Sequence, residues 1–475
     1  MNEIKQNKDY SELDSEKSQY STKIQLSFTL GFFLTTFMGI FFDSRMFIFY
    51  ETEVGLPVIY ILIALIVYGI WNMVNDPFIG FLSDKPNRLW KRWGRRFPWV
   101  IMAIIPYCLV FLLLFSPPDL DPVRNWLILF LWLLLMTCLL DLFLSIWNTN
   151  YYALYTDKFR SQKERTKVGG IGTIFGQLGI AIGVLIPPLF ITYGVKQTYL
   201  IAVSIVISIS IICIILMIPG IRENQDMIDR ALQMAKKKEE EKESFWKILK
   251  FAMKQKNFLV YTVAYTAFLT LVVIMLASIP YLNQYILKQP ASSETLITAG
   301  LLIGSLISIP LWVKLARKKG NKITFVTGML FTAVSIIPFL FNSDLFLAVI
   351  TSTLIGVGIG GIYLATYPLL SDVLDEIIVK TKKRQEGSFL GIRTFFNRLS
   401  YITQAMTFTI VHIITGFNPT PGAPQTDLAI WGIRIHLALI PMIIIFLGGL
   451  ILWKYCDIDA EKSASIKAQL KELNL

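Results

Sequence analysis

Residues 70–84 read IWNMVNDPFIGFLSD, the end of an apolar run that carries one carboxylate, Asp76, within it and is followed by a second, Asp84. A charged side chain at the centre of a membrane-spanning helix costs roughly 2.5–3.5 kcal/mol, so it is expected to face a partner, a cavity or a moving ion. The residues that follow, DKPNRLWKRWGRRFPW, hold six Lys and Arg before the next apolar run begins at Phe97. An acid inside a span, followed at once by a basic loop, indicates a membrane transporter rather than a soluble enzyme.

The composition predicts an all-α membrane protein. The chain is 54% hydrophobic and 16% charged, with a mean hydropathy of +0.56, whereas a soluble domain of this length needs far more polar surface. Twelve stretches are long and apolar enough to cross a hydrocarbon core of about 30 Å. They cover residues 24–50, 57–83, 98–116, 125–153, 168–193, 197–219, 257–287, 294–316, 322–341, 344–371, 388–416 and 429–454.

A long polar segment divides the twelve spans into two groups of six. Two such groups predict a transporter of two six-helix bundles, with its binding site near the membrane midplane between them. A plain linker is expected in the polar segment, with a regulatory partner site as the alternative. The predicted parts are an N-terminal tail 1–23, a first bundle 24–219, a linker 220–256, a second bundle 257–454 and a C-terminal tail 455–475.

The distribution of the basic residues predicts the orientation in the membrane. The net charge is +12, which could suggest a nucleic-acid partner. However, the loops after the even-numbered spans, with their flanks, carry 30 Lys and Arg, whereas the loops after the odd-numbered spans carry three. This bias predicts a protein of the cell membrane with both termini in the cytoplasm. Its basic loops would contact anionic lipid headgroups. No nucleic acid, no obligate protein partner and no cleaved signal peptide are expected.

Several sequence blocks resemble one transporter family. GFLSDK followed by WGRR is similar to the loop motif of the major facilitator superfamily. The longer string NDPFIGFLSD…WGRRFPW resembles the glycoside–pentoside–hexuronide:cation symporter family, as do FYETEVGLP, NTNYYALYTD…KERT and SDVLDEIIVKTKKRQEGSFLGIRTFFNR. The match covers most of the chain in the family's order. The resemblance implies the major facilitator fold and cation-coupled symport, with Na⁺ or H⁺, of a sugar or glycoside by alternating access.

The expected cation site lies on two spans. Asn72 and Asp76 are four residues apart and share one helix face. Asp76 matches one of the two family aspartates that bind the coupling cation, and Asn72 stands in place of the other. Ser145 and Asn148, three apart on the fourth span, match further positions near that site, so Asp76 would bind Na⁺ with these neutral oxygens or bind a proton. A structural bond from Asp76 to Asn72 is the alternative, and Asp141 either lines the cavity or makes a polar helix contact.

Two arginines on the eleventh span are candidates for a charge partner. Arg398 falls where one member of the family has a lysine near the cation site, so we expect it to be the countercharge of Asp76. A plain structural ion pair is the alternative. Arg393, five residues earlier, is expected to extend its charged head toward the cytoplasm.

The positions that bind sugar in the family are altered here. Thr36 and Thr173 align with an acid and an arginine that contact sugar in one family member, so both charged positions are neutral in this chain. Asp43, near the outer end of the first span, could take over a substrate role, or it could pair with Arg45 or Arg434.

Aromatic residues on the fourth span are also candidates for the substrate cavity. Trp147 and Tyr151 could stack on a sugar face, because aromatic rings offer large apolar surfaces. Packing against other helices is the default interpretation for both residues.

Charged residues at the predicted cytoplasmic ends are expected to latch neighbouring helices, and rocking bundles would break and remake such latches. The gating candidates are Asp84, Arg95 and Arg96 in the first half and Asp372, Asp375 and Arg384 in the second. The glycine-rich runs GGIGTIFGQLGIAIG and IGVGIGGIY are expected to let helices approach closely.

No enzymatic activity and no cofactor apart from the coupling ion are expected. The sequence shows no nucleophile–base pair and no metal-ligand spacing; His412 and His436 are interpreted as packed or pore-edge residues, and the four cysteines suggest no disulfide framework. Two alternatives stay open: a carrier of the same fold for lysolipids or other amphipathic solutes, and a receptor or scaffold without transport activity.

Overall fold

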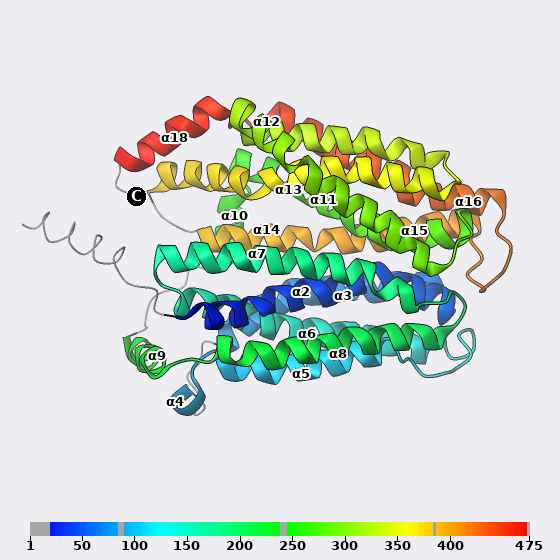
Figure 1. The fold of residues 1–475 in the computed structure, drawn as a ribbon, viewed down its shortest axis with the longest axis horizontal. Coiled ribbons are helices and arrows are strands. Elements are labelled where there is room, and N and C mark those ends of the chain that lie inside the picture. The colour runs from blue at the N-terminus through cyan, green and yellow to red at the C-terminus, as the bar shows by residue number, and fades with distance from the viewer. Residues whose placement is uncertain (1–19, 84–89, 238–244, 383–385, 473–475) are drawn as a thin grey trace, which may run out of the picture. The chain divides into compact units, whose positions relative to one another are not determined.

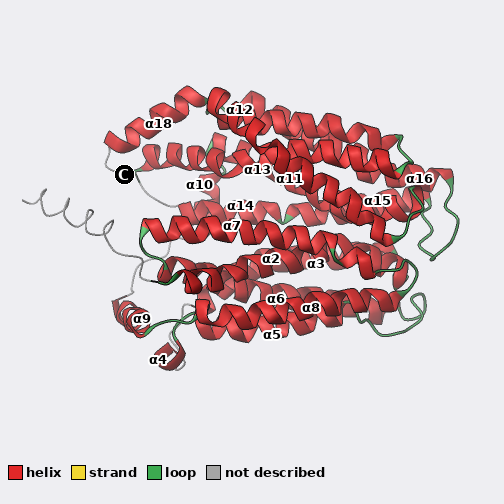
Figure 2. Cartoon of the chain, in the orientation of Figure 1, coloured by secondary structure: helices red, strands yellow, loops and turns green. Residues whose placement is uncertain are grey.

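The computed structural model describes residues 20–83, 90–237, 245–382 and 386–472. All regular structure within these ranges is helical, and the described part of the chain contains no strand (Figures 1 and 2). Ten helices in these ranges are long and apolar enough to cross a membrane. The predicted all-α membrane fold is therefore confirmed.

Two features separate these ten helices from the twelve predicted spans. The eighth and ninth predicted spans lie in α12 (Glu294–Ile336), which consists of two helices that meet at a kink at Gly320, where φ is 85°. The eleventh predicted span is divided at Arg398 into α14 (Glu386–Asn397) and α15 (Leu399–Thr415). With 12 residues, α14 alone is too short to cross a membrane, and α15, with 17 residues, is at the lower limit of length. The count of twelve crossings stays a prediction.

The chain divides into two compact units, which are described separately. Unit 1 lies within residues 1–42, 70–190 and 197–240, and unit 2 lies within residues 43–69, 191–196 and 241–475. The helices α2 (Thr22–Ile48) and α3 (Val58–Ser83) each contribute one part to each unit. The end of α2, the start of α3 and the turn between them therefore belong to unit 2. The division into two six-helix bundles stays a prediction.

Unit 1 is built mainly from long helices (Figure 1), and apolar side chains form most of its buried core. Its further elements are α4 (Trp90–Trp93), α5 (Phe97–Leu114), α6 (Trp126–Lys158), α7 (Gln162–Leu185), α8 (Lys196–Ile221) and α9 (Gln225–Lys237). Helix α7 begins where the side chain of Ser161 accepts a hydrogen bond from the backbone N–H of Glu164 at 3.2 Å, a favourable N-cap. Gly179 of α7 faces α2 so closely that an added Cβ would lie 2.6 Å from the carbonyl oxygen of Phe33.

Unit 2 contains the remaining helices and three π-helical turns. Its helices are α10 (Phe245–Ala252), α11 (Lys256–Tyr281), α12, α13 (Leu345–Thr381), α14, α15, α16 (Asp427–Arg434), α17 (Ile440–Tyr455) and α18 (Ala460–Glu472), and its π-helical turns are η1 (Phe49–Glu53), η3 (Leu282–Ile286) and η6 (Ile435–Leu439). Helices α12 and α13 pack most extensively. A Cβ on Gly304 or Gly356 would collide with a carbonyl oxygen of the other helix, that of Thr353 or Leu301. This contact confirms the close approach predicted from IGVGIGGIY.

The predicted C-terminal tail contains a helix, α18, bound to the end of α13. Lys467 and Ser463 of α18 contact Asp372 at 2.9 Å and 2.7 Å. Lys462 contacts Glu376 at 2.8 Å. Hydrogen-bonded ion pairs to two largely buried carboxylates therefore hold the last described helix on unit 2.

Candidate functional site

A buried polar contact joins α3 to α6 inside unit 1. Asn72 and Asn75 lie three residues apart on one face of α3. The Nδ2 of Asn72 donates a hydrogen bond to Oδ1 of Asp141, and the Nδ2 of Asn75 donates to Oδ2 of the same carboxylate at 3.1 Å. All three residues are at most 2% exposed. We call Asn72, Asn75 and Asp141 the α3–α6 cluster.

The α3–α6 cluster presents oxygen atoms that no residue in the described part of the chain satisfies. The Oδ1 atoms of Asn72 and Asn75 are buried and have no hydrogen-bond partner among the described residues. Buried polar atoms are normally paired, and carboxylate and amide oxygens are the ligands that hard cations prefer. The described residues hold no group of three His, Cys, Asp or Glu suited to a metal ion, so a cation here would depend on the amide oxygens.

The other predicted cation residues lie near this cluster in sequence. Asp76 follows Asn75 on α3, but its side chain lies outside the described part of the structure. Ser145 is buried one helical turn after Asp141 on α6. Asn148, further along α6, accepts a hydrogen bond from the hydroxyl of Thr35 at 3.4 Å. Asn75 was not predicted as a site residue from the sequence. Its position next to Asp76 in the NDP motif could have indicated that role.

The predicted substrate residues of unit 1 make packing contacts. The hydroxyl of Thr36 donates to the carbonyl oxygen of Gly176 on α7 at 2.8 Å, and the Thr173 hydroxyl donates to the backbone of its own helix. The rings of Trp147 and Tyr151 stack with centroids 5.1 Å apart and are 1% and 0% exposed. These contacts support the packing alternative for the two aromatic residues, and a substrate role for the four stays a prediction.

Asp43 makes neither of the ion pairs that were considered for it. Arg45 binds Glu294 through two contacts of 3.0 Å and 2.5 Å. Arg434 donates to backbone carbonyl groups, including that of Leu340 at 2.8 Å. The hydroxyl of Tyr401 donates to Asp43 at 3.5 Å. The interpretation of Asp43 as a partner of either arginine is therefore wrong.

A buried network in unit 2 connects the end of α2 to the start of α12. Arg45 and Glu294 are 3% and 1% exposed, so their charges are removed from water and compensate one another. The hydroxyl of Tyr193 donates a hydrogen bond to Glu294. The side-chain amide of Asn283 in turn donates a hydrogen bond to the Tyr193 oxygen at 3.1 Å. We call Arg45, Glu294, Tyr193 and Asn283 the Arg45 network.

Two π-helical turns, η1 and η6, contribute to a second buried network in unit 2. Glu51 of η1 receives a hydrogen bond from the hydroxyl of Tyr281 and lies 2.7 Å from Nδ1 of His412. His436 of η6 lies 2.8 Å from the hydroxyl of Ser278, and the two imidazole rings are 5.1 Å apart. Turns of this kind are common at functional sites. The two histidines are thus partners in one buried cluster, which their sequence positions alone did not reveal.

The two arginines near the division of the eleventh span have different surroundings. Arg398 stands between α14 and α15 in unit 2, whereas Asp76 belongs to unit 1, and their pairing stays a prediction. Arg393 is 9% exposed and lies 4.9 Å from the centre of the Tyr265 ring. The expectation that Arg393 extends into the cytoplasm is wrong, because its guanidinium gains a cation–π contact inside unit 2.

The gating candidates of the first half contact groups within unit 1. Nη1 of Arg96 donates to Ser83 at 3.2 Å and to Asn150 at 3.1 Å. The carboxylate of Glu223 accepts the backbone N–H groups of Arg95 and Arg96 at 3.0 Å and 2.6 Å, which satisfies free donors at the start of α5. Asp84 lies outside the described residues.

In the second half, Asp372 contacts α18, and Asn321 donates to its other oxygen at 2.9 Å. Asp375 lies on α13, and Arg384 lies outside the described residues. Asp372 therefore does hold neighbouring helix ends together, although its partners belong to α12 and α18 within one unit. A gating function for the six residues stays a prediction.

Comparison with known proteins identifies the family. A family model described as MFS/sugar transport protein matches residues 27–459. The chain is 23% identical to the sodium-dependent lysophosphatidylcholine symporter 1 of Xenopus tropicalis, over 87% of this chain and 83% of that protein. It is 24% identical to an uncharacterized symporter of Synechocystis sp., over 97% and 98%, and 22% identical to the lactose permease of Lactobacillus helveticus, over 92% and 69%.

The family match and the apolar helices agree on a multi-pass membrane protein. The family and these relatives are transporters, which confirms the resemblance to symporters found in the sequence blocks. Because the family model covers most of the chain, the chain belongs to the MFS/sugar transport protein family of transporters.

Proposed function

We propose that this protein is a secondary active transporter that moves a small solute together with Na⁺ or H⁺ by alternating access and leaves the solute chemically unchanged. The observation that carries the proposal is the α3–α6 cluster, because it buries a carboxylate and two amide oxygens that have no partner among the described residues. Buried ionisable groups in membrane helices mark ion pathways and proton relays. Relatives that are named as symporters support the coupling.

The cation would be held by groups from α3 and α6. Asp76 and Asp141 supply carboxylates, and Asn72 supplies an amide oxygen. Ser145 and Asn148 extend the same face of α6 by one and two turns. Two helices that contribute oxygens to one site let cation binding change how the helices pack, which is the requirement for coupling to a conformational change.

A sugar or glycoside is the proposed solute. The description of the matched family names sugar transport, and one relative is named a lactose permease. Asp43 is the best candidate for a solute contact, because a carboxylate can accept hydrogen bonds from two hydroxyl groups and neither Arg45 nor Arg434 pairs with it. Thr36 and Thr173 are neutral, so the solute is expected to differ from a sugar that is bound by an acid and an arginine at these two positions.

A lysolipid is the second candidate solute. The relatives in Xenopus tropicalis and mouse are named for lysophosphatidylcholine, and the chain covers more than four-fifths of each. The loss of two charged sugar positions is compatible with an amphipathic solute. For either solute, we propose a location in the cell membrane with both termini in the cytoplasm, on the basis of the Lys and Arg distribution.

Uptake into proteoliposomes tests this function. Wild type and Asp76→Asn would be compared under an imposed Na⁺ gradient, an imposed pH gradient and no gradient, with a panel of labelled sugars and labelled lysophosphatidylcholine. We expect gradient-driven accumulation of one solute class by wild type and its loss in Asp76→Asn. Absence of any uptake by folded protein would favour the receptor or scaffold alternative, and gradient-independent uptake by both proteins would reduce the function to facilitated diffusion.

A further inference from the structure

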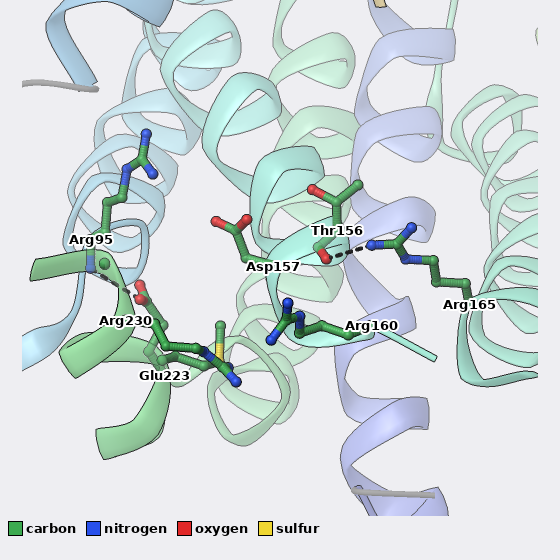
Figure 3. A pocket seen from close by; sticks show the side chains of 9 residues that line it. Arg95, Thr156, Asp157, Arg160, Arg165, Glu223 and Arg230 are labelled. Carbon is green, nitrogen blue, oxygen red and sulfur yellow. Dashed lines mark hydrogen bonds between the residues drawn. The ribbon is translucent and has the colours of Figure 1, made fainter. Parts of the chain in front are cut away.

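One pocket in unit 1 is lined by arginine side chains and lies apart from the α3–α6 cluster. Its volume is about 260 Å³. It forms where the end of α6, the start of α7, the segment before α5 and helix α9 meet (Figure 3). The charged residues that line it are Arg95, Arg160, Arg165, Arg230, Asp157 and Glu223.

The two acidic groups of the pocket form no ion pair with three of its arginines in the described part of the chain. The Glu223 carboxylate is directed to backbone N–H groups at the start of α5, with the Phe97 N–H at 2.9 Å as one donor. Among the described residues, neither Asp157 nor Glu223 forms an ion pair with Arg160, Arg165 or Arg230. The pocket therefore keeps an excess of positive charge.

Two guanidinium groups are directed toward the same space. Figure 3 shows the ends of Arg160 and Arg230 pointing toward one another, and neither side chain has a hydrogen bond or ion pair to the described part of the chain. Like charges that face each other repel, and an anion between them removes the repulsion. Arg165 is held in place by the carbonyl oxygens of Phe159 and Thr156, at 2.6 Å and 3.0 Å.

We propose that this pocket binds a phosphate group, with Arg160 and Arg230 as its main ligands and Arg165 as a third. Guanidinium groups match the oxygens of phosphate and can bind them through paired hydrogen bonds. The lining segments belong to loops that the Lys and Arg distribution places on the cytoplasmic side, where basic pockets of membrane proteins bind anionic lipid headgroups. A soluble phosphate compound presents the same chemistry, so the experiment separates the two sources.

The test measures binding by the purified full-length protein and does not depend on transport. In the lipid arm, the protein is placed in nanodiscs of phosphatidylcholine alone or with one-fifth phosphatidylglycerol, and retained lipid is counted by native mass spectrometry. In the soluble arm, thermal unfolding in detergent is followed with inorganic phosphate or with chloride of equal ionic strength. The variants are Arg160→Gln/Arg230→Gln, a charge-preserving Arg160→Lys/Arg230→Lys pair, and Arg317→Gln as a control on an exposed arginine of unit 2.

We expect wild type to bind in at least one arm, and the double glutamine variant to bind at least about tenfold more weakly per arginine removed, as for lost charged hydrogen bonds. The lysine pair should retain part of the binding, and Arg317→Gln should match wild type. Retention of phosphatidylglycerol alone assigns the site to a lipid, and stabilisation by inorganic phosphate alone assigns it to a soluble compound. The proposal is overturned if neither probe binds, or if the glutamine variant, melting like wild type without ligand, binds as tightly as Arg317→Gln does.

Discussion

Replacing Glu294 by leucine removes the carboxylate at the centre of the Arg45 network. Removing one partner of a buried ion pair costs about 3–5 kcal/mol, because the remaining charge stays buried without compensation. Both partners are almost fully buried, so this range applies here. Glu294→Leu also removes the acceptor of the Tyr193 hydroxyl, and an unsatisfied buried donor adds about 1–3 kcal/mol. Arg45→Met leaves Glu294 with that donor and should therefore cost less.

Thermal unfolding followed by tryptophan fluorescence measures the difference. At about 2–4 °C for each kcal/mol in a domain of comparable size, the ion-pair loss alone lowers the melting temperature of Glu294→Leu by roughly 6–20 °C. The double variant Arg45→Met/Glu294→Leu should recover much of this loss, because apolar side chains can replace a buried pair at little cost. Glu461→Leu, at an exposed position of α18, is the control. The reasoning is refuted if Glu294→Leu melts like this control, or if Arg45→Met is the more destabilised single variant.

Three further predictions follow from other contacts. Gly356→Val should lower the melting temperature by several degrees, because its side chain collides with α12, whereas Gly387→Val, which has open space around it, should change it little; equal effects contradict the packing. Glu51→Gln should destabilise unit 2, since it removes the buried carboxylate that accepts from Tyr281 and contacts His412; thermal unfolding of this variant at the wild-type temperature would contradict that role. Burial raises the pKa of Asp457, but hydrogen bonds from Lys462 outweigh this effect and hold the pKa below its usual value. The attachment of α18 should therefore persist down to about pH 4 and weaken only as the pH falls further. Hydrogen exchange of α18, corrected for intrinsic rates, measures this, and a loss of protection already above pH 4 would contradict it.

Helices and their close contacts could be predicted from the sequence because both depend on local patterns. Apolar length predicts a helix that can cross a membrane, and the glycines of IGVGIGGIY predict that α13 lies close to a neighbour. Residues four apart on one helix, such as Asn72 and Asp76, share a face by geometry alone. A break near Gly320 was predicted, because the basic residues of KLARKKGNK separate the spans 294–316 and 322–341. The break at Arg398 was not predicted, since the span 388–416 continues in apolar residues on both sides of it.

Polar contacts between helices could not be predicted in the same way. The pairing of Asn75 with Asp141 depends on how α3 and α6 are rotated relative to each other, which no spacing within one helix reveals. The same reason applies to Glu51 and His412, which are far apart in sequence and meet at 2.7 Å. Arg393 was expected to reach water because long basic side chains often do, but two aromatic rings provide a binding surface inside unit 2.

The most direct test of the account compares uphill accumulation with exchange in Asp141→Asn. Proteoliposomes loaded with unlabelled solute would report exchange of labelled solute without a cation gradient, and empty proteoliposomes would report accumulation driven by the gradient. If the α3–α6 cluster helps to hold the coupling cation, the variant loses accumulation and its dependence on the cation, while exchange continues. Accumulation at the wild-type level, with the same dependence on cation concentration, would show that Asp141 and the amide oxygens around it serve only to pack α3 against α6.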